Sequence, residues 1–136
     1  MEAIAAFSLA ANILPFFEFV SKLISLLWGI YFSGTEGVEE LDALRKTNQD
    51  LRHFLANFPQ LDTSDSMYTL FQDCRQLGQE LEASLDKLSG TEKIKKREAF
   101  KTAIKLIWKE DQIRSIQTRL DGFRAQLTLH LLNLLR

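Results

Sequence analysis

Three side chains in this sequence have the types needed for nucleophilic catalysis: the single cysteine, Cys74, and the two histidines, His53 and His130. A thiolate activated by a neighbouring imidazole is the pair that cysteine-dependent acyl-transfer enzymes use. Cys74, however, falls on an apolar helix face, where a free cysteine packs as a small hydrophobic side chain. The spacing of the three residues matches no zinc-ligand pattern. We therefore predict no catalytic residue, no cofactor-binding residue, no metal site and no enzymatic activity.

Composition and charge exclude several other classes of protein. The formal net charge of −1 disfavours a nucleic-acid partner, because such proteins are usually strongly basic. The single cysteine allows no internal disulfide, which favours a reducing cytoplasm. The acidic start, Met1-Glu2, is unlike a secretory signal. The sequence has no phosphate-loop motif, so we expect no nucleotide site within it.

The elements that must position these side chains are all helical, since apolar residues recur every three or four positions. We predict helices over 3–31, 36–58, 66–88, 92–109 and 110–136, with Pro15 kinking or breaking the first. Long helices with short connections form antiparallel bundles. The prediction is an all-α, antiparallel up-and-down bundle of four to five helices in one domain, 1–136.

Each later helix carries apolar residues along one face. The second has Leu41, Leu44, Asn48, Leu51, Leu55 and Phe58, which is a bundle seam with one polar member. The third has Met67, Leu70, Cys74, Leu77, Leu81 and Leu88. The fourth has Phe100, Ile104, Ile107 and Trp108, and the fifth has Ile113, Ile116, Leu120, Phe123, Leu127, Leu131 and Leu134.

The first helix is almost entirely apolar apart from a thin polar stripe. We define this polar stripe as Ser8, Asn12, Pro15, Glu18, Lys22, Ser25 and Gly29. A helix that is apolar nearly all round is normally buried, so we expect it at the centre of the bundle, covered by the others. Its uncharged run, 3–17, has 15 residues, whereas spanning a membrane takes about 20. A constitutive transmembrane helix is therefore not predicted.

The same helix suggests a second role, which is conditional insertion into a membrane. In that state the polar stripe would face partners or water, because a charge facing lipid is costly. Glu18 and Lys22 would lie on that side, although their i, i+4 spacing also fits a simple surface ion pair. The candidate insertion residues are Ile4, Phe7, Leu9, Ile13, Leu14, Phe16, Phe17, Glu18, Phe19 and Val20.

A basic block lies in the fourth predicted helix. It consists of Lys93, Lys95, Lys96, Arg97, Lys101, Lys105 and Lys109, and the last four recur at i+4 on one face. Such a face can simply be solvated, or it can bind anionic lipid head groups, worth about 1 kcal/mol per basic residue. Binding of nucleic acid is disfavoured, since no aromatic platform is interleaved with the lysines.

Several short segments resemble the N-terminal HeLo-like domain of fungal STAND (NLR-like) proteins. They are Asn12–Leu14, Phe17–Leu23, Phe71–Arg75, Phe100–Ala103, Ile107–Ile113 and Phe123–Leu132. The resemblance implies a helical bundle that precedes a nucleotide-binding oligomerisation module in a longer protein. It also implies a part in innate immunity and programmed cell death, through membrane permeabilisation after oligomerisation. Within the inserted helix, Glu18 would be the acidic residue.

Together these observations give two hypotheses from different classes. The first is a cytoplasmic cell-death effector that self-associates, moves to anionic membranes on activation and inserts its first helix. Its partners would be further copies of itself, membrane lipids and the C-terminal nucleotide-binding module. The alternative is a protein-protein interaction module, either a homodimer or an adaptor, with no membrane activity. An exposed apolar patch on the folded domain would favour this alternative.

Overall fold

The computed structural model describes residues 2–33, 37–63, 67–89 and 97–135, with side chains for 7–32, 42–63, 67–87 and 102–135. Within these ranges the chain forms five helices and no strand, which confirms the predicted all-α class. The helices are α1 (Glu2–Ser33), α2 (Gly37–Ala56), α3 (Tyr68–Ser89), α4 (Arg97–Ile107) and α5 (Glu110–Leu134).

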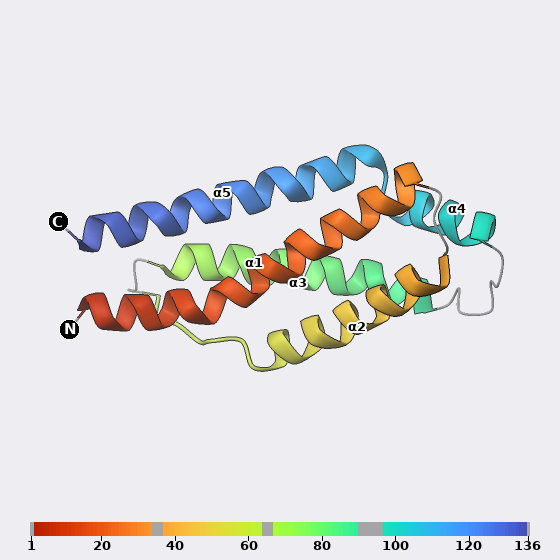
Figure 1. The fold of residues 1–136 in the computed structure, drawn as a ribbon. Coiled ribbons are helices and arrows are strands. Elements are labelled where there is room, and N and C mark those ends of the chain that lie inside the picture. The colour runs from red at the N-terminus through yellow and green to blue at the C-terminus, as the bar shows by residue number, and fades with distance from the viewer. Residues whose placement is uncertain (1, 34–36, 64–66, 90–96, 136) are drawn as a thin grey trace.

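The four long helices run up and down in turn, as Figure 1 shows. α1 and α5 lie side by side in opposite directions, and α2 and α3 form a second antiparallel pair. The short α4 lies at the end of the bundle away from both termini. α1 contacts all four other helices, most extensively α5 and α2. The first helix therefore holds the two pairs together.

Pro15 lies inside α1 without breaking it. The helix is continuous from Glu2 to Ser33, although proline removes one backbone donor. Pro15 is exposed, so the carbonyl that loses its partner can turn toward water. Figure 1 shows the axis of α1 changing direction in its N-terminal half. Of the two predicted outcomes, a kink or a break, the structure shows a continuous, bent helix.

The core is built from the predicted seams. In the described residues every buried side chain is apolar or cysteine, and the largest fully buried ones are Trp108, Phe16 and Phe71. Five apolar members of these seams are only partly buried and pack on the edge of the core: Leu55, Phe58, Ile107, Leu131 and Leu134. Leu41, Leu88 and Phe100 lie outside the described side chains. Each fully buried Leu, Ile or Phe contributes about 1.5–3 kcal/mol.

Gly78 marks a close approach between helices. A Cβ atom placed there would lie 2.9 Å from Leu55 Cδ2 and 3.2 Å from Phe16 Cε1. Both distances are below ordinary carbon–carbon contact. The absence of a side chain at Gly78 therefore lets α3 approach α1 and α2 closely.

Candidate functional site

The buried face of α1 supplies a large share of the core. Its members recur at three- and four-residue spacing, as expected for one side of a helix. They are Ala10, Ile13, Phe16, Phe17, Val20, Leu23, Ile24, Leu27 and Ile30. The helix is thus an integral part of the folded bundle, with the other helices covering this side.

The polar stripe faces solvent, so α1 is covered on one side only. Ser8, Asn12, Pro15, Glu18, Lys22 and Ser25 all lie at the surface, and Gly29 is half-buried. The expectation of a helix wrapped by its neighbours holds for the buried face and is wrong for the stripe. Glu18 and Lys22 point to water at i, i+4 spacing, and no ion pair between them is recorded among the described contacts.

The candidate insertion residues do not form one surface. Ile13, Phe16, Phe17 and Val20 are buried, whereas Leu9 and Phe19 are half-buried. Phe7, Leu14 and Glu18 are exposed, with 44% of Phe7 and 48% of Leu14 accessible. The side chain of Ile4 lies outside the described residues. Insertion through the whole set would therefore require α1 to leave its place in the core.

Large exposed apolar side chains occur near both chain ends, and also at the end of α1 and in α4, where Phe32 and Leu106 are each 74% exposed. Phe7 and Leu14 belong to the first half of α1, and Leu129 (61% exposed), Leu132 (55%) and Leu135 (66%) to the last turns of α5. Figure 1 places the N- and C-termini at the same end of the bundle. Single exposed apolar side chains are common on folded domains, whereas a contiguous apolar patch marks a site that contacts a partner or a membrane.

The C-terminal end of α1 is held by an aromatic anchor, which we define as Trp28, Tyr31, Lys105, Trp108 and Arg114. The Tyr31 hydroxyl donates a hydrogen bond of 2.7 Å to the carbonyl oxygen of Trp108. The Lys105 Nζ lies 5.3 Å from the centre of the Tyr31 ring, and the Arg114 Cζ lies 6.0 Å from that of Trp28. Both distances fit cation–π contacts.

Burial, and secondarily the charge of Glu110, raises the pKa of Tyr31, so its hydroxyl keeps its proton further into the alkaline range. The aromatic anchor was not predicted from the sequence. Its signal was the run of aromatics at Trp28, Tyr31 and Phe32, which share one face at i, i+3 and i+4 spacing.

The predicted basic face is shorter than expected. α4 ends at Ile107, and Lys109 is an extended residue before α5, where the Gln112 side chain accepts a hydrogen bond from the Lys109 backbone N–H. Lys109 therefore does not continue the i+4 series, although Lys105 and Lys109 are both exposed. Arg97 and Lys101 belong to α4 without described side chains, and Lys93, Lys95 and Lys96 lie outside the described residues.

The cysteine and histidines are on three separate helices. Cys74 is fully buried in α3, His53 is exposed on α2 and His130 is half-buried on α5. Burial, followed by the charge of Asp73, raises the pKa of Cys74 to about 12, so the thiol is protonated and a poor nucleophile. The described side chains include no group of three metal-ligating residues.

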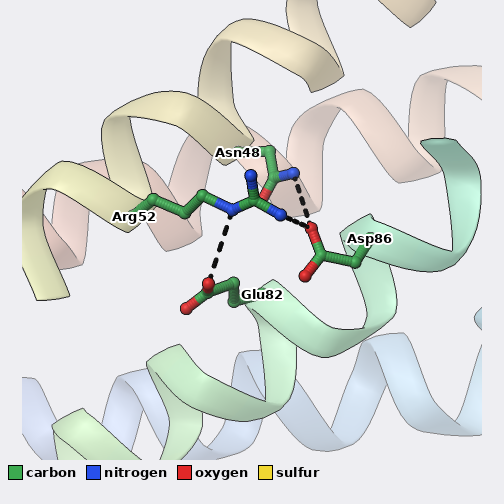
Figure 2. A network of polar contacts seen from close by, with 4 residues as sticks. All are labelled: Asn48, Arg52, Glu82 and Asp86. Atoms are coloured by element: carbon green, nitrogen blue, oxygen red, sulfur yellow. Dashed lines mark hydrogen bonds and ion pairs between the residues drawn. The ribbon is translucent and has the colours of Figure 1, made fainter.

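A polar cluster joins α2 to α3, and Figure 2 shows its four members, Asn48, Arg52, Glu82 and Asp86. The Arg52 Nε lies 3.4 Å from Glu82 Oε1, and its guanidinium also contacts Asp86. The Asn48 amide donates a hydrogen bond of 3.1 Å to Asp86 Oδ1. The sequence predicted Asn48 as the polar member of a seam and did not identify its partners, because they follow from the pairing of two helices.

Comparison with known proteins gave no relative. No family model, no curated protein and no solved structure matches the chain.

The geometry of α1 is therefore the main observation that bears on function. Among the described residues α1 alone is long and apolar enough to cross a membrane, with 26 residues from Phe7 to Phe32 and a mean hydropathy of 1.6. A buried core helix meets the same criterion, and 44% of its most apolar window is buried.

Proposed function

We propose that this domain is a non-enzymatic cell-death effector or signalling domain of a fungal NLR-like receptor. In this proposal the resting domain is cytoplasmic and keeps α1 in the bundle. Clustering by a C-terminal nucleotide-binding module brings several copies to an anionic membrane, and α1 then exchanges its helix neighbours for lipid. Clustering helps because several weak attachments act together.

The observation that carries the proposal is the asymmetric surface of α1. Its span from Phe7 to Phe32 is longer than the roughly 20 residues that a bilayer requires. The two charges within that span, Glu18 and Lys22, lie on the one polar stripe, so they would share a water-facing or partner-facing side after insertion.

The basic residues support the membrane part of the proposal. Lys105 and Lys109 are exposed near the α4–α5 junction, where they can reach lipid phosphates. Together with Lys93, Lys95, Lys96, Arg97 and Lys101, they would dock the domain before α1 inserts.

Dye release from phosphatidylserine-containing vesicles tests the proposal. The informative variant is the double substitution Phe7→Ser and Leu14→Ser, because both side chains are already exposed and their loss leaves the core intact. We expect release at least tenfold slower than for the unmodified chain. The matched control is Leu129→Ser with Leu132→Ser, which removes exposed leucines from α5 instead. Equal release by the Phe7/Leu14 variant and the unmodified chain would contradict insertion.

The interaction-module hypothesis is the second candidate, and the exposed leucines of α5 favour it. Leu129, Leu132 and Leu135 together leave apolar area in water at the end of the bundle. If this hypothesis is correct, the chain forms a stable dimer in solution, the Leu129/Leu132 variant is monomeric, and neither releases dye. Sedimentation equilibrium beside the vesicle assay separates the two functions.

A further inference from the structure

A groove of about 550 Å³ lies between α1 and α2, apart from the aromatic anchor and the polar cluster. Its volume is within the range of about 300–1,000 Å³ that small-molecule sites occupy. Phe19 and Leu26 of α1 and Ala43 of α2 give it an apolar lining, and all three are only half-buried. The groove therefore leaves apolar surface available to a ligand.

Two lysines border this apolar lining. Lys22 comes from α1 and Lys46 from α2, and both are exposed. No ion pair of either lysine is recorded among the described contacts, although Asp50 also lines the groove. The lining thus carries two positive charges and one negative charge, so its net charge is positive. The hydroxyl groups of Ser21 and Ser25 add hydrogen-bond donors.

We propose that this groove binds a single-chain amphiphile with an anionic head group, such as a fatty acid. The hydrocarbon tail lies on Phe19, Leu26 and Ala43, and the head group lies between Lys22 and Lys46. A cationic amphiphile lacks the charge match, and a small inorganic anion lacks the tail. Binding takes place from water to one folded domain, so this inference goes beyond membrane insertion and does not depend on it.

Isothermal titration calorimetry with dodecanoate below its micelle concentration tests the proposal. Lys22→Glu and Lys46→Glu each reverse a charge at the groove, while Lys87→Glu makes the same change at an exposed site on α3. We expect either groove substitution to weaken dodecanoate binding at least tenfold, and Lys87→Glu to leave it within twofold. Ala43→Trp fills the groove and should abolish binding, with circular dichroism reporting that the bundle is folded.

Two probes separate the contributions of the head group and the tail. Dodecyltrimethylammonium has the same tail with the opposite charge, and inorganic phosphate has the charge without the tail. We expect neither to displace dodecanoate at equal concentration. The proposal is overturned if the cationic amphiphile binds equally well, if phosphate alone competes, or if dodecanoate binds the Lys22→Glu and Lys46→Glu variants unchanged. Absence of dodecanoate binding to the unmodified chain would also overturn it, whatever the outcome of the dye-release assay.

Discussion

Gly78 and Gly122 show how differently two glycines within helices can be constrained. At Gly78 a methyl group would meet Leu55 and Phe16 within 3.2 Å, whereas at Gly122 it would meet nothing within 4 Å. Glycine costs a helix interior about 1 kcal/mol relative to alanine. At Gly78 this loss of helix stability is offset by the close packing that glycine allows. At Gly122 no neighbouring atom requires a glycine.

The two positions should therefore respond in opposite directions to a larger side chain. We expect Gly122→Ala to raise the free energy of unfolding by about 0.5–1 kcal/mol. Gly78→Val should lower it by about 1–3 kcal/mol, because the added carbons overpack a filled contact. Urea unfolding followed by circular dichroism measures both. A Gly78→Val variant as stable as the unmodified chain would contradict the described approach of α3 to α1 and α2.

Cys74 makes stability depend on pH in the alkaline range. Its pKa is about 12 in the folded chain against an ordinary value of 9.0, so only the unfolded thiol ionises in between. The stabilising contribution is complete below about pH 9 and is lost as the pH rises toward 12. We expect the stability advantage of the unmodified chain over Cys74→Ala to shrink from about pH 8 to about pH 10.5. Urea unfolding at both values measures it, and a constant difference would contradict the burial of the thiol.

At the scale of single elements, α1 is fixed at its C-terminal end by the aromatic anchor. Its N-terminal half instead shows Phe7 and Leu14 to solvent. The C-terminal half also exposes Phe32 (74%), and the N-terminal half buries Ile13, Phe16 and Phe17, so both halves are held by the core. The C-terminal half has in addition the hydrogen bond and the cation–π contacts of the aromatic anchor.

The Tyr31 hydrogen bond offers a direct measure of this attachment. We expect Tyr31→Phe to lower the free energy of unfolding by about 1 kcal/mol, because the Trp108 carbonyl loses its donor. Tyr68→Phe is the matched control, since Tyr68 is half-buried on α3 and no hydrogen bond of its hydroxyl is recorded. It should change stability by less than about 0.5 kcal/mol. Equal effects of the two substitutions would contradict a special role for Tyr31.

The sequence predicted elements better than it predicted the contacts between them. The apolar spacing of α2, α3 and α5 identified their buried faces, because helical period and burial are both local properties. It missed the end of α4 at Ile107 and the extended Lys109, where a side chain, Gln112, defines the start of α5. It also missed Glu82 and Asp86 as partners of Arg52, since the pairing of distant helices is not encoded in periodicity.

At the scale of the whole molecule, α1 cannot be removed without loss of the core. Deleting residues 1–21 takes away Ala10, Ile13, Phe16, Phe17 and Val20, all of which are buried. Truncating one large core side chain typically costs about 2–5 kcal/mol, and a domain has only about 5–15 kcal/mol in total. We expect the truncated chain to lose cooperative thermal unfolding by circular dichroism. Cooperative unfolding near that of the intact chain would show that α1 is dispensable for the fold.

The dependence of the core on α1 explains why point substitutions test insertion better than a deletion. A truncated chain that fails to release dye has lost both its insertion segment and its fold. Phe7→Ser with Leu14→Ser changes only side chains that are exposed in the folded bundle. The sequence could not indicate this distinction, because it marked all ten insertion residues alike and their burial depends on the other helices.

The ion pairs between described residues join α2, α3 and α5, and none of those named below involves α1. Arg52 links α2 to α3, Arg119 links α5 to α3 through Glu80, and the pairs of Arg45 and Arg114 lie within single helices. If α1 left the bundle, none of these pairs would lose a partner. α1 is held in the bundle mainly by apolar contacts, which have no preferred direction. The hydrocarbon interior of a membrane can replace such contacts. Added salt should therefore change the stability of the bundle little, because the exposed pairs between α2, α3 and α5 contribute only about 0–1 kcal/mol each. Cold should weaken the apolar contacts that hold α1.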